Sequence, residues 1–392
     1  MIDMDRSNWG RVRFGDVVAN SRETVKDPVG SGLDRVVALE HMEPGNIRLT
    51  GWQGAAGGTT FTRRFRAGQT LFAKRRAYQR KVAYAEFDGV CSGDILAFEA
   101  KREALLPELL PFIVRSDAFF DNALRTSAGS LSPRTKWQDL ATWEFDLPPL
   151  DEQNRIAELL WAVERVRLAR EREIEKASAL ELAVLASELD GANVPRVRLD
   201  EVVRIQRGLS YRSEDYAEPG QGRPFLTLKS VTRAGHYAEG SLKYLRLEDP
   251  GSYVVKPGDL FIANTDLTPG RLLVGAPFFY TGEQASDKPV FSMDLSRLIP
   301  VRQDASTEYL HLALRTPAAR AFMRANTGGS TVGHLHLKAL GGFMVAWPEE
   351  PVRRSLVEAM RGVVRASAIS RETTADLHQI GQVLSRILWE SR

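Results

Sequence analysis

The chain has 392 residues, of which 43% are hydrophobic and 26% charged, and its formal net charge is +3. This composition is typical of a soluble globular protein of two or three domains, and no stretch approaches the ~18 apolar residues of a membrane span. Cys91 is the single cysteine, which excludes a disulfide framework and a cysteine-based zinc site. The acidic start is no secretory signal, so we expect a protein of the reducing cytoplasm.

Short apolar runs bounded by glycine and proline predict strands. In the first half they lie at 36–39, 70–73 and 95–98, and in the second half at 225–228, 260–263 and 272–274. A helix is expected late in each half, at about 105–125 and 307–325, followed by a loop rich in Gly, Ser and Thr. The mixture predicts the α+β class.

Residues 147–160 (LPPLDEQNRIAELL) are predicted to end one structural element and to begin a helix. The paired prolines end the preceding element, because they lack a donor. Asp151 is a suitable N-cap, and Glu152 places a negative charge at the positive end of a helix. The same device returns at 347–360 (WPEEPVRRSLVEAM), 200 positions later.

Further matches between the two halves of the sequence indicate that the chain consists of two copies of one unit. Val12 matches Val197 at a shift of 185, Gly68 matches Gly258 at 190, and residues 108–110 match 308–310 at 200. A shift that grows and then holds is expected from a duplication with loop insertions in the second copy. We therefore predict two pseudo-repeated globular domains, 1–148 and 192–347, each followed by a long helix, 149–191 and 348–392.

Both long helices are free of proline after their first turn and carry apolar residues at heptad spacing, which predicts a helix pair. An antiparallel coiled coil follows from closed pseudo-symmetry. The alternative is that each helix packs on its own domain. The expected seam comprises Ile156, Leu159, Val163, Val166, Ala177, Leu180, Val184, Leu356, Val363, Leu377, Ile380, Leu384 and Ile387.

A basic stretch between Glu43 and Glu86 contains no acidic residue and interleaves arginines with aromatic residues, which favours a DNA surface over a solvated charged face. Its candidates are Arg63, Arg64, Arg66, Lys74, Arg75, Arg76, Tyr78, Arg80 and Lys81. The equivalents of residues 74–76 are Asn264, Thr265 and Asp266. Arginine suits guanine and asparagine suits adenine, so the two copies are expected to read different bases.

A second recurrent loop, 126–136 and 326–338, offers small hydroxylic residues and glycines that let backbone amides approach phosphates. The alternative is a simple polar turn. The candidates here are Ser130, Arg134, Lys136, Ser330, Thr331, His334, His336 and Lys338, and Arg207, Tyr211, Arg212 and Lys229 complete the DNA-binding set.

Motifs for a phosphate loop, a dinucleotide fold or a metalloprotease do not occur in the sequence. Asp94, Glu99 and Lys101 imitate the spacing of metal-dependent nucleases, although the second copy has no counterpart. The sequence therefore predicts a binding protein with no catalytic residue and no metal site.

The chain resembles the DNA-specificity subunit of type I restriction–modification systems. The likeness extends over essentially the whole chain and is strongest at residues 147–156 (LPPLDEQNRI), while the second joint, 349–353 (EEPVR), lacks the Glu-Gln pair.

The resemblance implies two target recognition domains that read the halves of a bipartite double-stranded DNA site. It also implies antiparallel helices that set the gap and dock two DNA methyltransferase subunits. S-adenosylmethionine would bind to the methyltransferase, and ATP and Mg to any restriction subunit, so no cofactor is expected on this chain. The alternatives are a metal-dependent nuclease and a coiled-coil scaffold without DNA contact.

Overall fold

The computed structural model describes residues 6–232, 236–238, 240–266, 270–282, 288–330 and 332–389. The chain forms two compact units, Met1–Glu171 with Glu372–Arg392, and Arg172–Arg371. Helices and strands are mixed in both, as the α+β expectation requires. Each long helix contributes to both units, so the units do not coincide with the four expected segments. In the described residues, no helix is long and apolar enough to cross a membrane.

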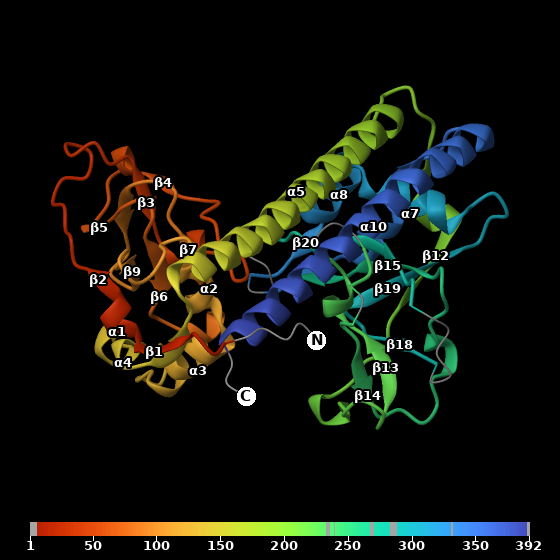
Figure 1. The fold of residues 1–392 in the computed structure, drawn as a ribbon. Coiled ribbons are helices and arrows are strands. Elements are labelled where there is room, and N and C mark those ends of the chain that lie inside the picture. Colours follow the sequence, from red (N-terminus) through yellow and green to blue (C-terminus); the bar gives the residue numbers. More distant parts are fainter. Residues whose placement is uncertain are drawn as a thin grey trace. The chain divides into compact units, whose positions relative to one another are not determined.

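The first unit contains a four-stranded antiparallel sheet in the order β2-β9-β6-β7 and a second sheet in the order β4-β3-β8-β5 (Figure 1). Its strands are β1 (Gly10–Arg13), β2 (Val18–Ser21), β3 (Arg35–Val37), β4 (Gln53–Gly54), β5 (Arg63–Phe65), β6 (Thr70–Ala73), β7 (Val82–Tyr84), β8 (Gly89–Cys91), β9 (Ile95–Ala100) and β10 (Glu144–Leu147). Its helices are α1 (Phe14–Val17), α2 (Leu110–Arg115), α3 (Asp117–Arg125), α4 (Trp137–Ala141) and the start of α5 (Leu150–Leu189).

The second unit has the corresponding sheets, β12-β19-β15-β17 and β14-β13-β18, and a small sheet β16-β21-β20. Its strands are β11 (Arg196–Arg198), β12 (Val203–Arg207), β13 (Arg223–Leu226), β14 (Lys243–Leu245), β15 (Leu260–Ala263), β16 (Thr265–Asp266), β17 (Pro277–Phe279), β18 (Val290–Phe291), β19 (Leu295–Pro300), β20 (Thr327–Gly328), β21 (Gly333–Leu335) and β22 (Met344–Ala346). Its helices are α6 (Leu199–Val202), α7 (Thr307–Arg315), α8 (Pro317–Ala325), α9 (Leu337–Gly341) and the start of α10 (Glu350–Trp389).

Several expected elements need correction. Residues 272–274 form no strand, because the chain turns at Gly275 (φ +69°) and the Asp266 carboxylate accepts hydrogen bonds from the amides of Leu273 and Val274. The helix expected at 105–125 is divided into α2 and α3 at Ser116, whose hydroxyl caps α3 through the Phe119 amide. The helix expected at 307–325 is divided in the same way at Thr316, into α7 and α8.

The long helices α5 and α10 span 40 residues each, about 60 Å at 1.5 Å per residue (Figure 1). Asp151 is not the N-cap, since α5 already begins at Leu150; it lies in the first turn, where its charge still favours the helix dipole. In the first unit, Ile156 and Leu160 of α5 share a core with Leu384 and Leu388 of α10. In the second unit, residues from the end of α5 share a core with Leu356 near the start of α10.

Only one of the two expected heptad lines is buried. The line through Ile156, Val163, Ala177, Val184, Leu356, Val363, Leu377 and Leu384 is buried or half-buried. The described members of the line three residues on are exposed: Leu159, Val166, Leu180 and Ile380. The side chain of Ile387 lies outside the described part. The second buried line is instead four residues on, at Leu160, Arg167, Glu181, Met360 and Leu388.

This correction has an electrostatic cause. Arg167 and Glu181 are charged, so an apolar pattern cannot reveal their burial. In the structure Arg167 forms ion pairs with Glu164 and Glu171, and Glu181 binds Arg315 through both carboxylate oxygens. Paired charges can occupy a buried line that an unpaired charge could not.

The joint at the start of α5 is held by Gln153, whose side chain is buried. Its amide donates to the carbonyls of Ala104 (2.8 Å) and Pro148 (2.9 Å), and its carbonyl accepts from the Leu106 amide (2.9 Å). These bonds satisfy backbone groups of the connecting segments that have no hydrogen-bond partner within a helix or a sheet. Gln153 of the sequence motif thus fixes the helix to the segment that precedes it.

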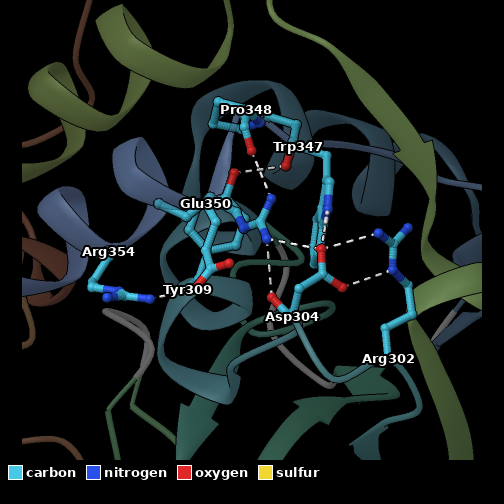
Figure 2. Close-up of polar contacts among 9 residues, drawn as sticks. Arg302, Asp304, Tyr309, Trp347, Pro348, Glu350 and Arg354 are labelled. Carbon is cyan, nitrogen blue, oxygen red and sulfur yellow. Dashed lines mark hydrogen bonds and ion pairs between the residues drawn. The ribbon is translucent and has the colours of Figure 1, made fainter.

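The second joint uses Arg353 at the position of Gln153. Figure 2 labels Arg302, Asp304, Trp347 and Pro348, which belong to this joint. Its guanidinium donates to the carbonyls of Pro348 (2.6 Å) and Asp304 (3.1 Å), which are the counterparts of Pro148 and Ala104. It also bonds the Asp304 carboxylate (2.9 Å) and stacks on Trp347 at 4.3 Å. Arg302 and Trp347 donate to the same carboxylate and hold the pKa of Asp304 below its ordinary value. The altered motif therefore preserves the contacts to both carbonyls.

Candidate nucleic-acid interface

A groove of about 690 Å³ in the first unit gathers basic and polar side chains from segments far apart in the sequence. The basic residues that line it are Arg22, Arg63, Lys74, Arg134 and Lys136. No acidic residue is among the described residues lining it. Asn20, Gln138 and several threonines supply amides and hydroxyls, and Phe61 and Trp137 supply aromatic faces. This combination can hold phosphates and contact bases.

The groove exists because the two recurrent loops of the sequence lie side by side. Arg75 and Arg134 form an isolated backbone bridge, and Arg134 forms another with Ala128. The Lys74 amide donates to the Asp94 carbonyl, and the Lys74 carbonyl accepts from the Thr135 amide. Sequence reasoning selected both loops separately but did not bring them together.

The second unit repeats this backbone arrangement. The Asn264 amide donates to the Asp294 carbonyl, and the Asn264 carbonyl accepts from the Leu335 amide. Thr265 pairs with His334, which also pairs with Gly328. These are the positions of Lys74, Arg75, Arg134 and Ala128 at the shifts of 190 and 200 found in the sequence.

Lys74 and Arg63 are the half-buried cations among the described residues of the groove. Burial, and to a smaller extent the neighbouring Arg63 guanidinium, hold the pKa of Lys74 below the ordinary lysine value. A phosphate nearby would favour its charged form. The Nε of Arg63 is buried and makes no hydrogen bond to the described residues.

The acid-free basic stretch is neutralised by carboxylates that lie outside it in the sequence. Arg66 forms a double hydrogen bond with Glu23 at 3.0 and 2.9 Å, and Arg64 binds Asp88 at 3.0 Å. Arg80 binds Asp117 and stacks on Phe120. Their charges are therefore largely compensated within the unit. The absence of acidic residues between Glu43 and Glu86 predicted a more basic surface than the structure has.

Other candidates support the loop itself. Arg75 contacts Asp94 and the Ser132 hydroxyl, and Lys81 donates to the Leu39 carbonyl (2.8 Å). Arg134 binds Asp94 at 2.8 Å, which lowers the pKa of that carboxyl. Arg76 and Arg80 are in the left-handed region, with φ of +55° and +53°, a conformation that non-glycine residues seldom adopt. Between them Tyr78 is exposed, as are Ser130 and Lys136 elsewhere on the unit.

The second-unit equivalents of residues 74–76 are buried, which corrects their interpretation as surface base readers. The Asn264 side chain donates to the Met293 carbonyl (3.1 Å), and the Thr265 hydroxyl bonds Asp294 (3.0 Å). Asp266 is likewise buried and holds the turn at 273–274. Small polar side chains here complete local hydrogen bonds, whereas Lys74 reaches into a groove.

The remaining second-unit candidates are mixed. Arg207, Arg212, Lys229, Ser330, His334, His336 and Lys338 are all exposed. Tyr211 accepts a hydrogen bond from Tyr216 and packs on Phe225, so its ring belongs to a small core. Thr331 lies outside the described residues.

The nuclease-like triplet is engaged in other contacts. Asp94 binds Arg134 and Arg75, Glu99 accepts from Gln69 (3.2 Å), and Lys101 donates to the carbonyls of Gly15 and Asp16. Within the described ranges, no group of three His, Cys, Asp or Glu residues is placed to hold a metal ion.

The groove also contains residues that sequence reasoning missed, namely Asn20, Arg22, Thr24, Thr60, Thr62 and Gln138. Arg22 and Asn20 follow the start of β2, and Thr60 and Thr62 precede β5. Short polar stretches of this kind carry no local signal. Only the pairing of β2 with β9, and of Thr24 with Arg63, brings them to the groove.

Comparison with known proteins finds similarity in sequence and in fold. No protein-family model matches the chain. The type I restriction enzyme EcoDI specificity subunit of Escherichia coli is 30% identical over 155 residues, which is 38% of this chain and 33% of that protein. The chain thus covers about a third of the length of this curated relative.

Solved structures extend the comparison to the whole chain. A type I restriction–modification S subunit from M. genitalium matches with a TM-score of 0.54 and 12% identity, covering 100% of this chain and 99% of that one. A chain from a study of complex assembly and conformational transition of the type I system matches with a TM-score of 0.49 and 23% identity, covering 97% of each. The resemblance to type I restriction–modification specificity subunits is therefore confirmed, by a curated relative in sequence and by the M. genitalium S subunit in fold.

Proposed function

We propose that this chain is a non-catalytic DNA-recognition subunit of a type I restriction–modification complex. The observation that carries the proposal is the groove of the first unit, with five basic residues and no acidic residue among its described lining. Basic side chains hold the DNA backbone, while the amides, hydroxyls and aromatic faces between them contact base edges.

Each unit reads one half of a bipartite site. The support is the shared backbone frame, in which Lys74 and Asn264 make the same two main-chain hydrogen bonds. The side chains on that frame differ, with Arg134 in the first unit and His334 in the second. A duplicated frame with different side chains suits the recognition of two different half-sites.

The helices form an antiparallel pair that sets the gap between the half-sites. The start of α5 shares a core with the end of α10, and the end of α5 shares a core with the start of α10. Opposite ends meet in both cores, as an antiparallel pairing requires. Because an α-helix rises by a fixed distance per residue, the length of the helices would fix the spacing between the two half-sites.

Methyltransferase subunits dock on the outer face of α5. Leu159, Val166 and Leu180 are 52%, 47% and 66% exposed, and their spacing places them along one side of the helix. Exposed apolar residues aligned in this way are typical of a protein interface. S-adenosylmethionine would then be bound by the methyltransferase, and ATP and Mg by a restriction subunit.

Selection from a random pool of DNA duplexes tests this function. The chain, reconstituted with its methyltransferase, should enrich one bipartite motif with a fixed gap, and its affinity should fall steeply with salt. Enrichment of no motif would refute sequence-specific recognition. Salt-independent behaviour without DNA retention would identify a scaffold, and magnesium-dependent cleavage by the purified chain would identify a nuclease.

A further inference from the structure

The two units treat one equivalent arginine differently. In the second unit Arg315 is buried and binds both oxygens of Glu181, a residue of α5. The equivalent arginine of the first unit is Arg115, 200 positions earlier. It donates one hydrogen bond to Glu164 (2.8 Å) and another to the Gly45 carbonyl (3.0 Å).

The counterpart of Glu181 on α10 is Gly381, again at a shift of 200. A Cβ atom at Gly381 would meet no described atom within 4 Å. Gly381 therefore interrupts the buried line of α10 where a side chain would otherwise close the space. A cavity of about 630 Å³ results, lined by Gly381, Leu377 and residues of α2, α3 and α5.

The cavity is rich in positive charge. Four arginines line it, Arg80, Arg115, Arg167 and Arg386, against two carboxylates among the described lining residues, Asp117 and Glu164. Arg80 and Arg386 both bind Asp117. Glu171 pairs with Arg167 from outside the lining and is a third carboxylate, so the arginines exceed the carboxylates among these described residues by one positive charge.

Arg167 is the most enclosed of these groups, with only 7% of its side chain exposed. Its Nε and Nη2 lie 2.9 and 2.8 Å from one Glu164 oxygen, and its Nη1 pairs with Glu171. Glu164 also accepts from Arg115, so two guanidinium groups of the lining share this carboxylate.

We propose that this cavity is a binding site for phosphate groups. Guanidinium forks match the oxygens of phosphate, and an anion would offset the positive charge in excess around the cavity. The volume suits an anion of pyrophosphate to nucleotide size. The site is separate from the groove, although the segment from Lys74 to Arg80 lines both. The phosphate could come from a free phosphorylated molecule or from a DNA backbone.

Calorimetric titration of the full chain with inorganic pyrophosphate at low salt tests the site. Wild-type protein should bind, and Gly381→Glu should lower the affinity by roughly tenfold or more, because the new carboxylate occupies the place that Glu181 takes beside Arg315. Gly362→Glu is the matched control, since it adds the same charge to α10 at an exposed position with no described atom within 4 Å. This control should bind pyrophosphate like wild type.

Both glycine substitutions should keep or increase helix content by circular dichroism, because glutamate is the better helix former. Arg386→Gln, at a side chain that is 61% exposed, should also weaken pyrophosphate binding without lowering the melting temperature. No binding by wild-type protein, or equal binding by Gly381→Glu, would overturn the proposal.

Duplex DNA in the same assay identifies the source of the phosphate. If the site holds a DNA phosphate, Gly381→Glu lowers DNA affinity and reduces the salt slope by about one. If the site holds a free phosphorylated molecule, pyrophosphate binding is lost while DNA affinity is unchanged. Pyrophosphate binding does not require DNA recognition, so the site can fail or hold independently of the proposed function.

Discussion

At the scale of single residues, protonation of the Lys74 amine makes the charge of the groove depend on pH. Its pKa is lowered, so the unfolded chain binds more protons than the folded chain between the lowered pKa and the ordinary lysine pKa of 10.5. Across that window the Lys74 contribution to folding stability therefore improves as pH rises. A bound phosphate acts in the opposite direction, because it favours the protonated amine.

DNA affinity should therefore decline as pH rises through the lowered pKa of Lys74, and binding should take up protons. Lys74→Arg should flatten this decline, since arginine keeps its charge throughout the range. The measurement is DNA affinity by fluorescence anisotropy from about pH 7 to 10. Lys176→Arg, at an exposed position of α5, should keep the wild-type profile. An unaltered pH profile in Lys74→Arg would exclude Lys74 from the phosphate contact.

Residue chemistry also shows what the sequence could predict. The recurrent positions of the loops were correct, and their backbone contacts recur at the same shifts. The electrostatic environment was not predictable, because Glu23 and Asp88 come from segments that pairing of distant strands brings to Arg64 and Arg66. Arg353 likewise replaces Gln153 with different atoms that reach the same two carbonyls.

At the scale of elements, the long helices were predictable in position and length but not in the face that they bury. A repeat of seven residues marked one correct line, and the other line failed because its buried members include the charged Arg167 and Glu181. An ion pair formed across elements has no signature in the hydrophobic pattern. The residues that were displaced from the predicted seam are exposed and so available to a partner.

The exposed line of α5 should contribute to methyltransferase binding. Replacing Leu159, Val166 and Leu180 together by glutamine should weaken that binding by about tenfold or more, because each contributes apolar area that a partner would bury. The unfolding midpoint in urea should stay nearly constant, since these side chains are exposed in the free chain. Leu160→Gln is the contrasting variant, because Leu160 is buried and its loss should destabilise the fold. Wild-type affinity in the triple variant would place the interface elsewhere.

At the scale of the whole molecule, a change in one recognition unit should impair the reading of one DNA half-site and leave the other half-site unaffected. Replacing Arg22 and Lys136 by alanine removes two groove cations that have no carboxylate among the ion pairs of the described residues. The selected DNA motif should lose or relax one half and keep the other, and the salt slope should fall by about two. Sequencing of the selected pool measures the first effect, and a salt titration measures the second. Loss of both halves together would contradict modular reading.

The mixed class of the fold and the two long helices were predictable from the sequence, because proline pairs and apolar runs are strong local signals. The units themselves were not, since their boundaries cut through the helices rather than between helix and domain. The core shared by the start of α5 and the end of α10 joins residues more than two hundred positions apart, such as Ile156 and Leu384. Local patterns carry no information on such contacts.

That division of the helices has a consequence for synthesis of the chain. The second unit, Arg172–Arg371, is one continuous segment, whereas the first unit needs Glu372–Arg392 to complete its core around Leu384, Leu388 and Trp389. A chain emerging from the ribosome in order would therefore have every residue of the second unit available before the first unit can close. The domain made first is the one completed last.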